Sequence, residues 1–142
     1  MNIKYEKNAL TGETLAYMWN TIGWGNMSLH KAKTAIENTL YSIVAMENDT
    51  IVGIGRMIGD KAMVWYIQDL IVLPEYQGKG IGSVIMNNLI EYAKSNSIFN
   101  EEFQIGLMAA KEKEAFYQQL GFRSRPNEKE GSGMVMDIKC QL

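Results

Sequence analysis

The chain has 142 residues, a length typical of one compact domain with a single hydrophobic core. Its residues are 46% hydrophobic, 10% aromatic and 21% charged, which excludes a disordered or fibrous chain. The 14 Lys and Arg against 16 Asp and Glu give a net charge of −2, which excludes a general electrostatic attraction to nucleic acid or to an anionic membrane.

The first part of the chain is predicted to hold one strand and two helices. Apolar and polar residues alternate over Asn2–Lys7, as they do in a half-buried strand. Thr11 is the predicted N-cap of the first helix, and the second helix, Ser28–Leu40, begins with a capping serine. A glycine-rich loop between the two helices carries Trp24 and Met27.

The middle of the chain is predicted to be a β-hairpin followed by a central strand. Ser42–Met46 and Thr50–Met57 are apolar runs separated by three polar turn residues, a pattern typical of a hairpin. The run Ala62–Leu73 is rich in β-branched and aromatic residues and ends at Pro74, which predicts a buried central strand.

A glycine cluster follows the central strand and opens a helix whose apolar residues recur at helical spacing. Three further elements are expected: a strand over Glu102–Met108, a short helix over Glu112–Leu120 and a last strand over Met134–Ile138. Hairpins first and strand-helix crossovers later predict a mixed α/β or α+β sheet with helices on both faces.

The glycine cluster, Gln77–Gly82, is suited to bind the oxygens of a phosphate group. A helix N-terminus preceded by glycines presents unpaired backbone N–H groups and the positive end of the helix dipole. A dinucleotide fingerprint is excluded because Ile85 or Ser83 stands where its third glycine is required. A P-loop is excluded because Lys79 precedes the glycine and the hydroxyl residue.

The spacing that does fit is Gln-x-x-Gly-x-Gly, formed by Gln77, Gly80 and Gly82. It resembles the acetyl-coenzyme A loop of the GNAT superfamily of N-acetyltransferases, and the resemblance is strongest over Tyr66–Gly82 and again over Ala115–Phe122. The family implies a single domain over the whole chain. It also implies a mixed, mostly antiparallel sheet of six to seven strands, with about four helices on both faces.

The resemblance implies acetyl-coenzyme A as co-substrate, with no metal. The end of the central strand would hydrogen-bond the pantetheine arm as an added strand does, and the loop backbone would hold the diphosphate. Lys79 and Ser83 each have a structural alternative: a solvated lysine, and a hydroxyl bonded back to its own helix. The predicted cofactor contacts are Leu70, Ile71, Val72, Gln77, Gly78, Lys79, Gly80, Ile81, Gly82, Ser83 and Phe116.

The family places a general acid at the position of Tyr117, where it protonates the leaving thiolate. Several relatives carry Glu or His where this chain has Gln68, whose amide cannot accept a proton at neutral pH. Asp69 is the nearest candidate base, and a hydrogen-bonded structural Asp is its alternative. A water chain held by Gln68, or capture of the neutral fraction of the amine, are further routes. A strand N–H near Leu70 would polarise the carbonyl.

The acceptor site is predicted from the loop between the first two helices, where Trp24 and Met27 lie, together with Tyr66 on the central strand. An aromatic wall suits an arylalkylamine or another small amphipathic amine, held by cation–π contact. Two alternatives stay open: a sensor that binds acetyl-coenzyme A without catalysis, and transfer to a protein or peptide amine. Arg56, in an apolar strand, would anchor a carboxylate or pair with Asp60 or Asp69.

The cysteine content and the first residues of the chain indicate in which compartment the protein is expected to act. The single Cys140 cannot close an internal disulfide, and no Cys and His spacing predicts a zinc site. The charged first ten residues differ from a signal peptide, and no apolar run reaches the roughly 20 residues of a spanning helix. The sequence therefore predicts a cytoplasmic enzyme without membrane or nucleic-acid partners, and it leaves a homodimer open.

Overall fold

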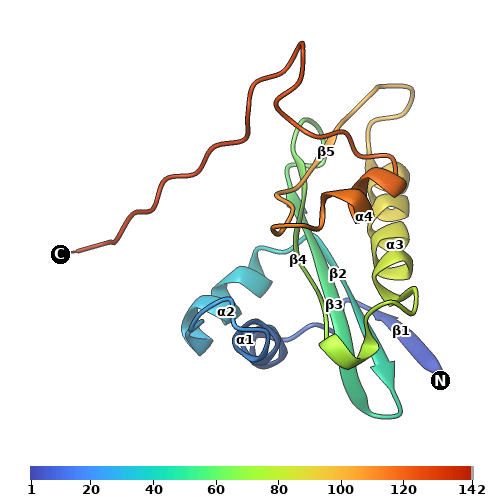
Figure 1. Cartoon of the computed structure of the whole chain (residues 1–142), viewed down its shortest axis with the longest axis vertical. Coiled ribbons are helices and arrows are strands. Elements are labelled where there is room, and N and C mark those ends of the chain that lie inside the picture. The colour runs from blue at the N-terminus through green and yellow to red at the C-terminus, as the bar shows by residue number, and fades with distance from the viewer. Residues whose placement is uncertain (142) are drawn as a thin grey trace. The chain divides into compact units, whose positions relative to one another are not determined.

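The computed structural model describes residues 1–141 and divides into two compact units, one over residues 1–107 and one that begins at Met108. The first unit contains nearly all of the regular secondary structure (Figure 1). Its elements in chain order are β1 (Ile3–Lys7), α1 (Gly12–Thr21), α2 (Leu29–Glu37), β2 (Tyr41–Glu47), β3 (Thr50–Gly59), β4 (Trp65–Val72), the 3-10 turn η1 (Pro74–Tyr76), α3 (Ile81–Asn96) and β5 (Ile105–Gly106).

The five strands form one sheet in the order β1-β2-β3-β4-β5. The first four are antiparallel neighbours, and β5 runs parallel to β4 after the α3 crossover. The predicted class, a mixed and mostly antiparallel α+β sheet, is confirmed. The predicted six to seven strands are too many, since the described residues form five.

One predicted strand is shorter than expected and another is absent from the described structure. The strand expected over Glu102–Met108 shrinks to Ile105–Gly106, which pairs with the first two residues of β4. The segment Met134–Ile138 has no regular secondary structure, so that prediction is wrong for this structure. Its apolar residues suit a strand, but a strand exists only where a partner completes its hydrogen-bond ladder, and this segment has none among the described residues.

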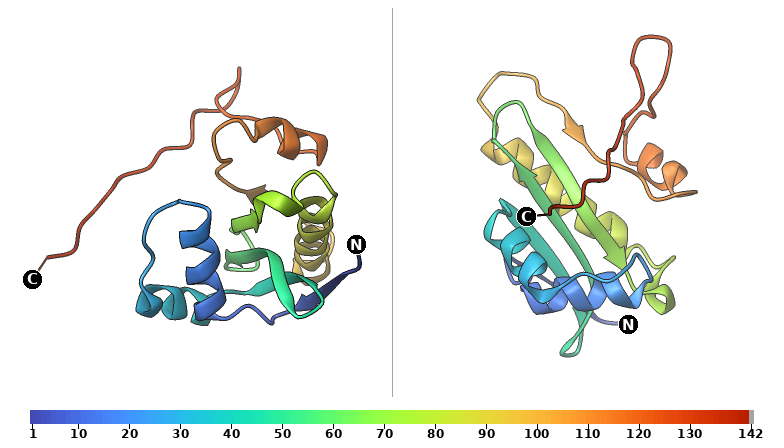
Figure 2. Two further views of the ribbon diagram at one scale, coloured as in Figure 1. Left: turned by 60° about the horizontal axis from the view of Figure 1, so that its bottom comes forward. Right: turned by 90° about the vertical axis from the view of Figure 1, so that its left-hand side faces the viewer.

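Helices cover both faces of the sheet in the first unit. Figure 2 shows α1 and α2 on one face and α3 on the other. The face under α1 and α2 carries a core cluster of Leu10, Leu15, Met18, Ala32, Val44, Ile54, Ile71 and Leu73. On the other face, a Cβ on Gly55 would lie 2.6 Å from Ile85 Cγ2 of α3, so this glycine lets the helix approach the sheet closely.

The two predicted helix caps are confirmed. Thr11 Oγ1 accepts from the Thr14 N–H at 3.2 Å, and Ser28 Oγ accepts from the Lys31 N–H at 3.1 Å. The second helix ends at Glu37 rather than at Leu40, because the Leu40 N–H donates to the carbonyl of Met57 in β3 at 2.8 Å. Pairing with the sheet therefore ends the helix before Leu40.

The central strand begins at Trp65 rather than at Ala62. The Asp60 carboxylate accepts hydrogen bonds from the backbone N–H groups of Ala62, Met63 and Val64 at 2.8–2.9 Å. These bonds wrap the chain into a turn and lower the pKa of Asp60. The residues before Trp65, although they are typical of a strand, therefore form part of this turn.

The second unit holds one short helix, α4 (Glu114–Gln119), and a cross-linked loop. Gly121 follows the helix with φ +103°, a left-handed conformation that ends it. In the loop, the Arg123 guanidinium donates two bonds of 2.7 Å to Glu130, and Asn127 donates a third. The two donors, Arg123 first, lower the pKa of Glu130 to about 2.

Candidate functional site

The glycine loop lies between η1, which follows β4, and the start of α3. Gly78 has φ +74° and Gly80 has φ +85°, and a Cβ at either position would meet no atom within 4 Å. Glycine is therefore needed at both positions because the backbone is left-handed there, and not because a side chain would collide with a neighbour. Residues 77–80 are exposed, so the outer side of the loop is open to a ligand.

The N-terminus of α3 is available for an anion. Gly80 is the N-cap and brings no capping side chain. The first N–H groups of a helix, here those of Ile81, Gly82 and Ser83, have no acceptor within it, and α3 is 16 residues long with its positive end here. Backbone N–H groups in this arrangement can bind the oxygens of a phosphate group.

Side chains around the loop fix its position. Gln77 Nε2 donates to the carbonyl of Val72, the last residue of β4, at 2.8 Å. The Lys79 ammonium lies 5.5 Å from the centre of the Tyr76 ring, and the Tyr76 hydroxyl donates to Glu47 at 2.9 Å. The Gln77 side chain therefore ties the loop to the strand. The contribution of Tyr76 and Glu47 was not visible in the sequence, because Glu47 lies in a distant hairpin.

A β-bulge interrupts the pairing of β3 with β4 above the loop. Gly55 alone stands opposite two residues, Asp69 and Leu70, and the register shifts there. Asp69 has φ +59°, which is uncommon for a non-glycine residue and which Asp tolerates better than most. The bulge bends β4 at the place where the sequence predicted acetyl-group binding.

The bulge overturns the strict alternation expected along β4. That alternation placed Leu70 on the face of Gln68, and Ile71 on the face of Ile67. In the structure Ile71 joins the core cluster under α1 and α2, whereas Leu70 Cδ1 lies 3.6 Å from a Cβ built on Gly55, on the α3 face. One extra residue in β4 turns every later side chain to the opposite face.

One edge of β4 has no described strand beside it from Ile67 onward. The described pairing with β5 covers only Trp65 and Tyr66, so Ile67–Val72 has no strand beside it on that edge. An extended ligand could add there as a further strand, hydrogen-bonded to the β4 backbone. The open edge leads to the glycine loop, because Val72 is followed by η1 and then by Gln77.

A buried ion pair sits at the bulge. The Arg56 Nε–H donates to Asp69 Oδ2 at 2.7 Å, and the two side chains are 11% and 1% exposed. The Asp69 carboxylate also accepts from Gln68 Nε2 at 3.3 Å, and Arg56 Nη1 donates to Thr39 Oγ1 at 3.2 Å. Arg56 therefore pairs with Asp69 rather than with Asp60, and it joins β3, β4 and the chain after α2.

The predicted acceptor residues differ in exposure. Trp24 is 43% exposed and makes an edge-to-face contact of 5.0 Å with Trp19. Met27 instead packs against the core cluster, and its N–H donates to Asn20 Oδ1 at 2.8 Å. Tyr66 is half-buried on β4. Trp24 is the member of the set that presents an open aromatic surface.

Tyr117 belongs to the second unit, on α4. It is half-buried between the rings of Phe116 and Phe122, at centroid distances of 5.0 and 6.1 Å. Desolvation by this burial raises the pKa of the Tyr117 phenol. The hydroxyl therefore keeps its proton through neutral pH, as a general acid must. Phe122 was not singled out from the sequence.

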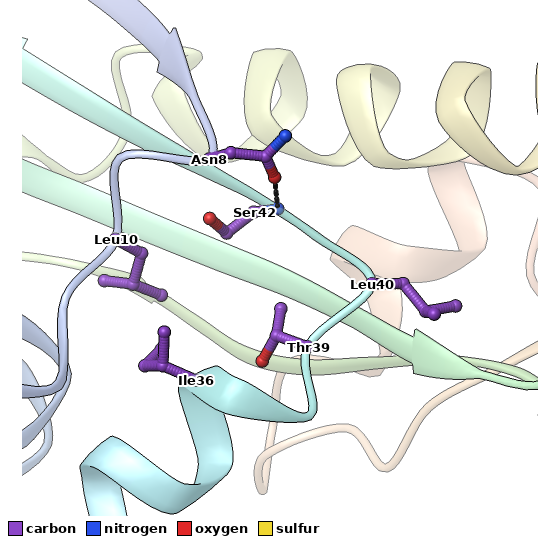
Figure 3. Close-up of a pocket in the computed structure, with 6 residues that line it drawn as sticks. All are labelled: Asn8, Leu10, Ile36, Thr39, Leu40 and Ser42. Atoms are coloured by element: carbon purple, nitrogen blue, oxygen red, sulfur yellow. Dashed lines mark hydrogen bonds between the residues drawn. The ribbon is translucent and has the colours of Figure 1, made fainter.

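Two cavities in the first unit lie apart from these residues. One, of about 250 Å³, is lined by residues that follow β1, by the end of α2 and the residues after it, and by β2: Asn8, Leu10, Ile36, Thr39, Leu40 and Ser42 (Figure 3). In Figure 3 the Ser42 N–H donates to Asn8 Oδ1, at 3.1 Å. The other, of about 460 Å³, is lined by Glu13, Thr14, Tyr17, Asp49, Thr50, Ile51 and Leu73. Neither contains a predicted site residue.

Comparison with known proteins shows which family this chain belongs to. The family model of the acetyltransferase (GNAT) domain matches residues 13–137. The chain belongs to the GNAT family. It is therefore an acyltransferase of the acetyltransferase class, as its sequence predicted.

Individual relatives agree with the GNAT assignment. An uncharacterized N-acetyltransferase of Pyropia yezoensis is 29% identical over 82% of this chain and 67% of its own length. A histone acetyltransferase of Glycine max is 30% identical over 79% of this chain and 52% of its own. A Staphylococcus aureus structure, described as a probable acetyltransferase, superposes with a TM-score of 0.85 at 28% identity, covering 96% of this chain and all of the other.

The predicted site residues lie in both units of the structure. The structure brings together the open end of β4, the glycine loop and the start of α3 in the first unit, while Phe116 and Tyr117 lie in the second. Among the described residues no group of acidic, His or Cys side chains could hold a metal ion, and no helix is both long and apolar enough to span a membrane.

Proposed function

We propose that this GNAT protein transfers the acetyl group of acetyl-coenzyme A to a primary amine by direct attack in a ternary complex. The observation that carries the proposal is the continuous backbone surface from the open edge of β4 to the glycine-capped N-terminus of α3. Both units would form one acetyltransferase domain, since the family match runs across the boundary between them.

The donor would be held mainly by backbone groups. N–H groups of residues 78–83 would bind the diphosphate, with Lys79 adding positive charge, and the backbone of Leu70, Ile71 and Val72 would bind the pantetheine arm. The bound thioester supplies an activated acetyl group. A backbone N–H at the bulge, near Leu70, would polarise its carbonyl oxygen.

Proton transfer would use one side chain and water. Tyr117 would donate its proton to the leaving thiolate, and its raised pKa means that the hydroxyl is protonated before the reaction. Asp69 is a weak candidate base because Arg56 already pairs with its carboxylate. We therefore propose that the amine loses its proton to water held near Gln68, or binds as the neutral species.

The acceptor would be a small amphipathic amine. The exposed Trp24 and its edge-to-face partner Trp19 offer an aromatic surface that can hold an ammonium group before deprotonation. A second candidate, transfer to a protein or peptide amine, is favoured by the name of the Glycine max relative. A non-catalytic sensor would bind the donor without turnover.

Donor binding is tested by titrating acetyl-coenzyme A into the protein and into Gly80→Ala by calorimetry. Alanine disfavours φ +85° by about 1–2 kcal/mol, so the loop of the free variant should relax to another conformation and must be restored on binding, which should weaken binding by about tenfold. Gly131→Ala is the matched control, since an added Cβ there is also unobstructed and no left-handed φ applies. Absence of heat with the unmodified protein would contradict the proposal.

Acceptor class is tested with a panel of amines and peptides, with products read by mass. Small arylalkylamines are expected to be acetylated, and Trp24→Ala should raise their KM by about fivefold, since a cation–π contact with an exposed ring contributes about 1 kcal/mol. Leu29→Ala removes a side chain of similar exposure, 45%, and should leave KM unchanged. Acetylation of peptides alone would favour the protein-amine alternative, and binding without turnover would favour the sensor.

A further inference from the structure

Tyr76, the last residue of η1, connects the glycine loop to the hairpin of β2 and β3. Its hydroxyl donates a hydrogen bond to Glu47 Oε1, at the end of β2, at 2.9 Å. Its ring is half-buried and packs against the core cluster under α1 and α2. The hairpin and η1 lie at the same end of the sheet (Figure 1). Tyr76 is therefore held from two sides, although the loop that follows it is exposed.

The hydrogen bond from Tyr76 to Glu47 is of a strong kind. The acceptor is a carboxylate, and bonds to an ionised acceptor are roughly twice as strong as bonds between neutral groups. The bond itself, followed by desolvation and by the charges of Glu47 and Glu75, raises the pKa of the Tyr76 phenol. The phenol therefore keeps the proton that it donates. A bonded hydroxyl and a ring packed on the core leave this side chain little freedom to change rotamer.

The Lys79 ammonium lies over the ring of Tyr76. Its Nζ is 5.5 Å from the ring centre, within the roughly 6 Å over which a cation is attracted to an aromatic face. No carboxylate in residues 1–141 forms an ion pair with Lys79. A ring contact occupies one side of an ammonium group that has three N–H donors. Donors therefore remain for a ligand at the loop.

The ring contact lowers the entropy that Lys79 loses when it binds a phosphate. A lysine side chain has many rotamers in water, and a ligand that fixes it removes most of that freedom. Lys79 stands between two exposed glycines, so no neighbouring side chain in the loop restricts it, and the ring of Tyr76 does so instead. A ligand then meets an ammonium group that is already held, which is the advantage of a preorganised site.

We propose that Tyr76, held by Glu47, is a positioning residue for the donor, which keeps the Lys79 ammonium over its ring and beside the diphosphate of bound acetyl-coenzyme A. The inference rests on the proposed donor site at residues 77–83. Tyr76 itself would touch no atom of the donor and would act through Lys79. Its effect on donor binding should therefore exist only while residue 79 carries a charge.

A double-mutant cycle tests this coupling, with calorimetry of acetyl-coenzyme A as the readout, so no acceptor is needed. Lys79→Met should raise the dissociation constant by at least about fivefold, because a charged hydrogen bond is lost. Tyr76→Leu should raise it by about two- to fivefold, the factor that a cation–π contact at an exposed site contributes. In the Lys79→Met background, Tyr76→Leu should have no effect. Lys31→Met removes the same charge from an exposed position on α2 and should change nothing.

Two further measurements keep the test independent of folding defects and of the donor's other phosphate. Tyr76→Phe keeps the ring and removes only the bond to Glu47, so it should weaken binding less than Tyr76→Leu does, and only while Lys79 is present. Circular dichroism checks that each variant is folded. The 3′-dephospho form of the donor should give the same factors, because the ammonium is placed at the diphosphate.

Three results would overturn the positioning role of Tyr76 while the donor still binds. An equal effect of Tyr76→Leu in both backgrounds would show that the ring only supports the fold. Tighter binding by Tyr76→Leu would show that the ring competes with the donor for Lys79. Effects that vanish with the dephospho donor would place the ammonium at the 3′-phosphate. Absence of heat with the unmodified protein would instead overturn the donor site itself, and the positioning role with it.

Discussion

Tyr117→Phe is expected to lower kcat by about 10²–10⁴-fold while the dissociation constant for acetyl-coenzyme A stays unchanged. The substitution keeps the aromatic contacts with Phe116 and Phe122 and removes only the hydroxyl proton. Thiol release measured with a colorimetric reagent gives the rate, and calorimetry gives the affinity. Tyr17→Phe removes the hydroxyl of a tyrosine that is 61% exposed on α1 and should have no effect.

The pH dependence of kcat also tests whether Tyr117 is the general acid. Burial raises the pKa of Tyr117 above its ordinary value of 10.0, so the acid form is present at all lower pH values and is lost only as pH rises beyond that raised pKa. The unmodified protein should therefore show a falling limb of kcat only above about pH 10, and Tyr117→Phe should lack it. A variant with the rate and profile of the unmodified protein would exclude Tyr117 as the acid.

Arg56→Met is expected to lower the free energy of unfolding by about 3–5 kcal/mol, because it leaves the buried Asp69 carboxylate without its cation. That loss is a large fraction of the roughly 5–15 kcal/mol that stabilises an ordinary domain. Chemical denaturation measures it. Lys94→Met breaks the exposed pair with Glu91 instead, and should cost no more than about 1 kcal/mol.

A second substitution at the bulge tests whether the stability is lost because a buried charge is unpaired or because a side chain has changed shape. Asp69→Asn removes the negative charge and keeps a side chain that tolerates φ +59°, so adding it to Arg56→Met should restore much of the lost stability. If the double variant were no more stable than Arg56→Met, an uncompensated buried charge could not be the cause of the loss.

Asp69→Asn alone also tests the candidate base. An ion-paired carboxylate that only holds the bulge should be replaceable with little change in kcat, provided the protein stays folded. A fall comparable to that of Tyr117→Phe would instead identify the Asp69 carboxylate as the base.

Sequence alone determined the local features of this protein. Thr11 and Ser28 cap helices, and the hairpin turns where three polar residues separate two apolar runs. Gly80 opens α3 in a left-handed conformation next to the strand end. Each of these features depends on residues within a few positions of one another, so the chain sequence specifies them directly. The family motif has the same local character.

Tertiary structure alone decided what depends on distant partners. The bulge at Asp69 requires a register shift against β3, and it places Leu70 and Ile71 on faces that strict alternation assigns the other way. Arg56 had several possible partners in sequence, and the strand register selected one. The apolar Met134–Ile138 forms no strand, because β-structure needs a neighbour to complete its hydrogen bonds, and sequence pattern cannot supply that neighbour.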